Sequence, residues 1–156
     1  MTDLHARSAI ESGARPRAQY AALPWRRGEN LEVLLITSRE TGRWVIPKGW
    51  PTRGRSPAAA AAAEARQEAG LVGEIAKTPI GSYLYVKFGK TGRGTPCKVK
   101  VFPLKVTGQH ESWREMGERT AHWFPADEAA GAVQERQLAR LIRKFAKRET
   151  KAAAKG

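Results

Sequence analysis

The chain has 156 residues, 41% of them hydrophobic, and a net charge of +13, which suits one globular domain with its own core. A single cysteine, Cys97, excludes an intrachain disulfide and predicts a reducing, cytoplasmic setting. No apolar run approaches the roughly 18 residues of a membrane span and the N-terminus lacks the apolar core of a secretion signal, so we expect neither membrane insertion nor secretion.

The first third of the chain predicts a disordered start followed by strands. Residues 1–16 are polar and without periodicity, which indicates a disordered N-terminus before a folded domain of residues 17–146. Strands are expected at residues 19–25, 31–37 and 44–46. The second is the clearest, because residues 33–36 form a continuous apolar run typical of a central strand covered on both faces.

A helix is predicted over residues 57–69. Ser56 is a favourable N-cap, Pro57 fits the first helical position, and Gly70 is a natural C-terminal stop. The alanines of residues 58–63 are strong helix formers, and their small side chains would let the helix lie close to a sheet.

The second half predicts more strands and a final helix. Alternating patterns indicate strands at 81–88 and 97–106, after an extended segment at 73–79, and Pro103 indicates a sheet edge or an irregularity. We expect Cys97 to be half-buried, a short strand at 120–124 and a helical turn from Pro125. The last helix, about 133–148, has an apolar face, and from residue 147 the chain is expected to pass into a basic flexible tail, 147–156. This order predicts an α/β fold with a mixed sheet between helices.

The positive charge is concentrated at the C-terminus. Residues 136–156 hold eight Lys or Arg and one Glu, so this segment accounts for +7 of the net charge and the rest of the chain for +6. A solvated basic helix face is favoured over a nucleic-acid surface. The remaining +6 suits a polyanionic small molecule as partner.

Two carboxylates stand out on the predicted helix. Glu64 and Glu68 are four residues apart and share a face with Gln67. A pair of this kind is most often a solvated surface. The alternative is a binding site for a hard cation, which prefers oxygen ligands.

The surrounding stretch, residues 49–71, reads GWPTRGRSPAAAAAAEARQEAGL and resembles the box of the Nudix hydrolases, G-x5-E-x7-R-E-U-x-E-E-x-G-U, in which U is aliphatic. The matching positions are Gly49, Glu64, Glu68, Gly70 and Leu71. Further segments resemble the diadenosine-polyphosphate and diphosphoinositol-polyphosphate branch of that family: residues 43–51 (RWVIPKGWP), Trp113 to Glu115, Arg119, and Trp123 with Phe124.

Three positions depart from the box. Arg55 stands at the first Glu, as a basic residue often does in that branch; Ala63 stands at the Arg, and Gln67 at the first Glu of the E-E pair. Because divalent affinity depends on ligand charge, Gln67 predicts weaker magnesium binding than a full box would give.

The resemblance implies an α/β/α sandwich and a magnesium-dependent site, with Mn²⁺ as a second choice of metal. The catalytic residues would be Glu64 and Glu68. The metal ligands would be Gly49 through its carbonyl, Glu64, Gln67, Glu68 and a loop carboxylate, for which Glu115 is the first candidate and Glu118 the second. Basic and hydroxyl side chains beside the box would hold the other phosphates: Arg17, Ser38, Arg39, Arg43 and Lys48.

The leading functional hypothesis is therefore a pyrophosphohydrolase acting on a diadenosine or diphosphoinositol polyphosphate. The departures motivate a second hypothesis, a degenerate domain that binds a nucleotide or polyphosphate without efficient turnover. A third is a protein that binds RNA or processes RNA ends through its basic C-terminal helix.

Overall fold

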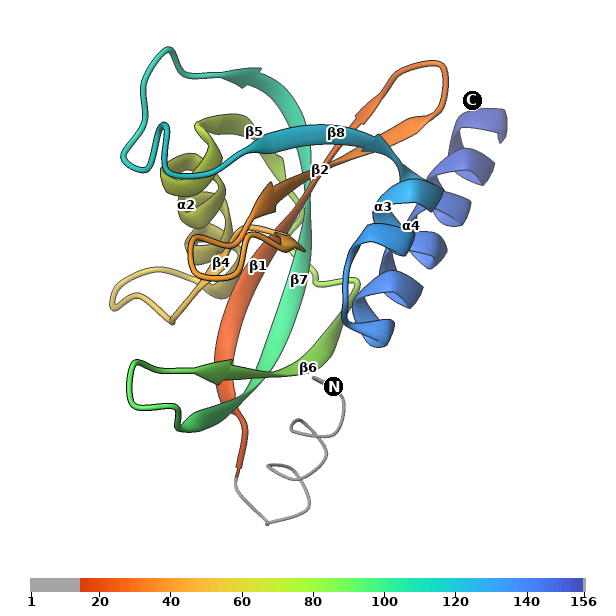
Figure 1. The fold of residues 1–156 in the computed structure, drawn as a ribbon. Helices are drawn as coiled ribbons and strands as arrows, with labels where there is room; N and C mark the ends of the chain where they lie inside the picture. The colour runs from red at the N-terminus through yellow and green to blue at the C-terminus, as the bar shows by residue number, and fades with distance from the viewer. Residues whose placement is uncertain (1–14, 156) are drawn as a thin grey trace.

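A mixed β-sheet lies between helix α2 (Pro57–Ala69) on one face and helices α3 (Ala126–Ala132) and α4 (Arg136–Lys155) on the other (Figure 1). The computed structural model describes residues 15–155. The predicted α/β/α arrangement is confirmed, while the predicted disorder of the N-terminus falls almost wholly outside the described residues. None of the helices in residues 15–155 is both long and apolar enough to cross a bilayer.

The described strands form one eight-stranded sheet. In chain order they are β1 (Arg17–Arg27), β2 (Leu31–Thr37), β3 (Trp44–Val45), β4 (Lys48–Gly49), β5 (Leu71–Ile75), β6 (Gly81–Phe88), β7 (Gly94–Gln109) and β8 (Ala121–Pro125). The central path runs β3-β2-β1-β7-β5, with β8 beside β2, β4 beside β1, and β6 beside β7. Among these strands only β1 and β7 pair in parallel.

Every predicted strand is present, but β1 and β7 extend beyond the expected bounds. Their parallel register runs from Arg17 opposite Cys97 to Trp25 opposite Lys105. Pro103 lies inside the central strand β7, so the prediction of a sheet edge was wrong. An irregularity does occur there, because on this side of β7 the neighbour changes from β5 to β6, and the Pro103 carbonyl accepts a hydrogen bond from the Ala76 amide. Cys97 is fully buried rather than half-buried.

Helix α2 matches its predicted bounds and its caps. The Ser56 hydroxyl accepts a hydrogen bond from the Ala59 amide, and Gly70 closes the helix in the left-handed conformation with φ 69°. Glycine is needed at position 70 for two reasons: the left-handed backbone conformation favours it, and an added Cβ would overlap the Trp113 ring. The alanine face packs on the sheet as predicted, with Ala61, Ala65 and Ala69 buried in one of the two core clusters.

The second core cluster lies on the other side of the sheet, under α3 and α4. Leu138, Ile142 and Phe145 are buried there and Leu141 packs against them, so the predicted apolar face is confirmed. The helix itself differs from prediction: it runs to Lys155, so residues 147–155 are helical instead of a flexible tail. Their alanines and lysines are strong helix formers, and the Glu149 carboxylate pairs with Arg27 at 3.0 Å.

Candidate active site

The carboxyl groups of Glu64 and Glu68 are neighbours on the face of α2 that meets β4. Glu68 is only 5% exposed, and its Oε2 accepts a hydrogen bond from the Lys48 amide at 3.2 Å. The Glu64 carboxylate lies directly against the backbone of Gly49, because a Cβ built at that glycine would overlap it. The two residues of the short strand β4 therefore contact both carboxyl groups, Lys48 that of Glu68 and Gly49 that of Glu64.

Arg119 is the nearest cation to this pair. Its Nη2 lies 3.3 Å from Glu68 Oε1 and 2.9 Å from Glu115 Oε1, while Nη1 donates to the Thr37 carbonyl at 3.1 Å. Since it is anchored on three sides and mostly buried, Arg119 orients the Glu68 carboxylate. The sequence indicated that Arg119 pairs with a loop acid, which is confirmed, but its contact with Glu68 was missed. The downstream Arg of the family resemblance was the signal that could have revealed it.

Ionisation of both carboxyl groups, Glu64 and Glu68, is unfavourable at this site. Burial, and then a hydrogen bond shared with the Glu64 carboxyl, raise the pKa of Glu68 from 4.5 to about 9, against the opposing charges of Arg119 and Lys48. Burial likewise lowers the pKa of Lys48 to about 8, opposed by the charge of Glu68. A bound cation would remove the repulsion between the two carboxylates.

In protein stripped of metal, Glu68 is expected to make thermal stability fall as the pH rises from about 4.5 to about 9. Within that window the folded state holds a proton that the unfolded state releases, since the folded pKa is the higher. Glu68→Gln removes this titration, so the variant should melt roughly 5 °C above wild type at pH 8 and equally with it at pH 4. Calorimetry in EDTA across this pH range checks it; a pH-independent difference would contradict the assignment.

Glu115 reaches the site only through Arg119. It also lies 3.5 Å from Arg39, whose Nη1 donates to Glu118 at 3.1 Å, and these acids raise the pKa of Arg39. Within residues 15–155 no group of three or more His, Cys, Asp or Glu side chains is placed to share a metal ion. The structure thus brings two predicted carboxylates together and leaves the third in an ion pair.

The predicted phosphate-binding residues are spread around the site. The Arg17 guanidinium stacks on the Trp50 ring at 4.3 Å, immediately beside Gly49. Arg43 is paired with Glu135 at 2.7 Å, and Ser38 lies in the turn where its amide bonds to the Arg43 carbonyl. Lys48 is half-buried, with its ammonium 5.1 Å from the Tyr85 ring centroid. Arg17 and Lys48 are therefore the ones that the structure places beside the box.

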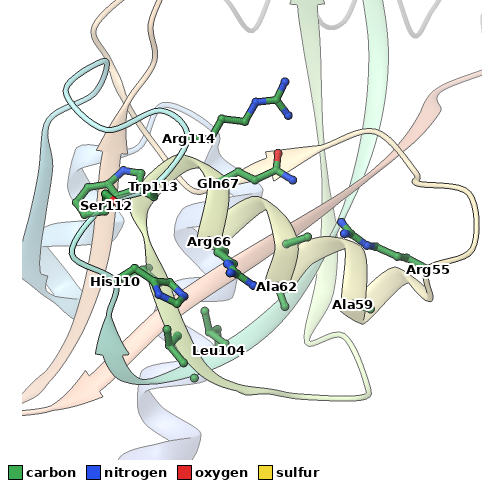
Figure 2. A pocket seen from close by; sticks show the side chains of 14 residues that line it. Arg55, Ala59, Ala62, Arg66, Gln67, Leu104, His110, Ser112, Trp113 and Arg114 are labelled. Carbon is green, nitrogen blue, oxygen red and sulfur yellow. The ribbon is translucent and has the colours of Figure 1, made fainter.

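The Gln67 side chain faces a cavity that Glu64 and Glu68 do not line. Its carboxamide lines a cavity of about 620 Å³ between α2, β5 and the loop after β7 (Figure 2). It makes no hydrogen bond to the Glu64 or Glu68 carboxyl group, and its backbone carbonyl accepts the Glu115 amide at 3.0 Å. The sequence correctly placed the three side chains near one another but could not show that Gln67 faces this cavity.

The donor set fits a hard divalent cation. Glu64 and Glu68 offer carboxylate oxygens and the Gly49 backbone offers a neutral one, whereas the predicted ligand Gln67 faces the cavity. Cys97 is buried in the core cluster on the other face of the sheet from α2. Two charges instead of three predict weak binding, because affinity for Mg²⁺ rises with ligand charge.

Comparisons with known proteins agree with this geometry. The family model of the NUDIX domain matches residues 16–147. Nudix hydrolase 12, mitochondrial, of Arabidopsis thaliana is 30% identical over 74% of this chain, which spans 58% of that protein, little more than half its length. Diphosphoinositol polyphosphate phosphohydrolase 3-beta of Bos taurus is 29% identical over 78% of this chain and 71% of its own length.

The fold is also found among solved structures. The binary complex of the C. elegans Ap4A hydrolase superposes with a TM-score of 0.61 over 83% of this chain and 94% of that one, at 20% sequence identity. Since the identity is low, this likeness concerns the fold. The box residues, the sandwich and the family match together establish that the chain contains a NUDIX domain and belongs to the Nudix hydrolase family.

Proposed function

We propose that this chain is a divalent-metal-dependent pyrophosphohydrolase that cleaves a phosphoanhydride in a nucleoside or inositol polyphosphate. The observation that carries the proposal is the carboxyl pair of Glu64 and Glu68 beside β4, in which Glu68 is buried and oriented by Arg119 and the half-buried Glu64 lies against Gly49. The names of the bovine and nematode proteins, a diphosphoinositol polyphosphate phosphohydrolase and an Ap4A hydrolase, suggest the substrate class.

The site supplies charge and position. Glu68, Glu64 and the Gly49 carbonyl would hold Mg²⁺ or Mn²⁺, which when bound would neutralise the phosphoryl oxygens and lower the pKa of water. Arg119 fixes the orientation of Glu68, and the Lys48 amide fixes its second oxygen. Glu64 lies beside Gly49 and is the candidate general base. Arg17, stacked on Trp50, offers a guanidinium for a phosphate beyond the scissile bond.

The deciding experiment is phosphate release from diadenosine tetraphosphate and from a diphosphoinositol polyphosphate, with Mg²⁺ titrated to high millimolar concentration. Turnover that requires metal supports the proposal, and the preferred substrate names the branch. An absence of turnover at every Mg²⁺ and Mn²⁺ concentration on both substrates would refute it.

Gln67→Glu is expected to lower the Mg²⁺ concentration for half-maximal rate about tenfold, because it adds a negative charge where the box has a ligand. The rate at saturating Mg²⁺ should change less. Mg²⁺ titration of wild type and variant measures this, and Gln137→Glu, on α4, is a control with the same change of charge, because a carboxylate there can still accept the hydrogen bond from the Leu84 amide. Equal half-maximal concentrations would show that position 67 takes no part in metal binding.

The alternative function is a domain that binds a polyphosphate without turning it over. Two observations favour this alternative: Gln67 is oriented into the cavity, and Glu115 is ion-paired with Arg119. Only the Glu64 and Glu68 carboxylates then remain to bind a metal ion. Binding of substrate by the wild type without turnover, with activity gained in Gln67→Glu, would support this alternative.

A further inference from the structure

All three departures from the Nudix box line one cavity. Arg55, Ala63 and Gln67 are separated along the chain, yet each contributes to the 620 Å³ space beside α2 (Figure 2). A full box would place Glu, Arg and Glu there, a net charge of −1. With Arg55, Ala63 and Gln67, this chain places a net charge of +1 there. The three substitutions therefore change the charge on this side of the cavity from negative to positive.

Two further arginines face the same space. Arg66 comes from α2 and Arg114 from the loop after β7, and His110 and Trp113 complete that side. No acidic side chain of the described residues lines the cavity. Its permanent charge is therefore positive, from Arg55, Arg66 and Arg114.

These arginines differ from those around the carboxyl pair. Arg39, Arg43 and Arg119 each hold a carboxylate within 3.5 Å. None of the ion pairs and side-chain hydrogen bonds found in residues 15–155 involves the guanidinium groups of Arg55, Arg66 or Arg114. All three nevertheless line one cavity, which brings like charges together. Their hydrogen-bond donors are thus available to an anion.

The cavity floor leaves room for that anion. Ala59, Ala62, Ala63 and Arg66 follow the i, i+3, i+4, i+7 spacing of one helix face, and the alanines add little bulk. Ala63 matters here because the arginine of a full box would fill part of this space.

We propose that this cavity is a metal-independent phosphate subsite, in which Arg55, Arg66 and Arg114 bind a phosphate group of a polyphosphorylated small molecule. Guanidinium groups bind phosphate through paired, charge-assisted hydrogen bonds. The subsite rests on the proposed function and deepens it by adding a place for phosphates in a cavity that Glu64 and Glu68 do not line. Binding there requires neither metal nor hydrolysis, so it can be tested apart from turnover.

The test is calorimetric titration of the full chain with tripolyphosphate in EDTA at fixed ionic strength. Each of Arg55→Gln, Arg66→Gln and Arg114→Gln is expected to weaken binding about fivefold, and the triple variant about 50-fold. The matched control is Arg136→Gln, Arg140→Gln and Arg143→Gln together, which removes the same charge from the exposed face of α4 and should weaken binding less than about threefold.

A second variant tests the space without altering the charge. Ala59→Leu adds bulk to the α2 side of the cavity at an exposed helical position that tolerates leucine, and it should weaken tripolyphosphate binding several-fold at an unchanged melting temperature. Glu68→Gln should bind tripolyphosphate as wild type does, which separates this subsite from the hydrolytic site.

Two results would overturn the subsite: no binding of tripolyphosphate by wild type, or equal losses of binding in the cavity triple variant and the α4 triple variant. If wild type binds tripolyphosphate in this way but releases no phosphate from either substrate, the subsite stands and the proposed hydrolysis fails.

Discussion

Glu68→Gln is expected to reduce phosphate release from the preferred substrate by about 10³-fold or more at saturating Mg²⁺. Glutamine keeps the shape of the side chain and the hydrogen bond from the Lys48 amide. It loses the negative charge that a divalent cation needs and that Arg119 orients. Initial rates over a range of Mg²⁺ concentrations measure the effect, and calorimetry shows whether Mg²⁺ still raises the melting temperature.

Glu74→Gln is the matched control, since Glu74 is exposed on β5 and makes no contact with the carboxyl pair. It should retain the wild-type rate. The assignment of Glu68 fails if Glu68→Gln keeps more than about a tenth of wild-type activity, or if Mg²⁺ stabilises variant and wild type equally.

Gly49→Ala is expected to lower activity about 100-fold while changing the free energy of unfolding by only about 1 kcal/mol. The added Cβ would lie 2.8 Å from Glu64 Oε2 and closer still to the rest of that carboxylate. Because the obstacle is the flexible end of a side chain, Glu64 can rotate away at little cost in stability. The same rotation takes the carboxylate out of the site. Rates and urea denaturation of the same preparations separate the two effects.

Gly131→Ala, in α3, serves as the control, because an added Cβ there meets nothing within 4 Å. Its activity should equal that of wild type. Large losses of both activity and stability in Gly49→Ala would mean that the glycine is needed for the backbone of β4. An unchanged activity would mean that Glu64 is not held where the chemistry occurs.

Two groups of arginines in the described residues differ: those paired with acids near the carboxyl pair, and those without an acidic partner at the cavity. Around the carboxyl pair, Arg39 and Arg119 are satisfied by acids, so they orient carboxylates. At the cavity, Arg55 and Arg66 are exposed and have no acidic partner among the described residues. Helix α2 therefore presents Glu64 and Glu68 towards β4 and Arg66 to the cavity.

Local sequence features determined much of the fold. Ser56, Pro57 and Gly70 fixed the bounds of α2, because caps and left-handed stops act through neighbouring backbone groups. The apolar run of residues 33–36 likewise marked β2 as a covered strand. The spacing of Glu64 and Glu68, read with the box around them, was enough to bring both carboxylates to one site, since residues four apart on a helix are neighbours.

What depends on distant parts of the chain was decided only by the tertiary structure. The parallel pairing of β1 with β7 joins residues about 80 positions apart, and local patterns carry no record of such partners. The contact of Arg119 with Glu68 needs the loop after β7 to fold over α2. The shared cavity of Arg55, Ala63 and Gln67 needs the packing of that loop against α2 and β5, because a sequence shows three separate substitutions where the fold makes one surface.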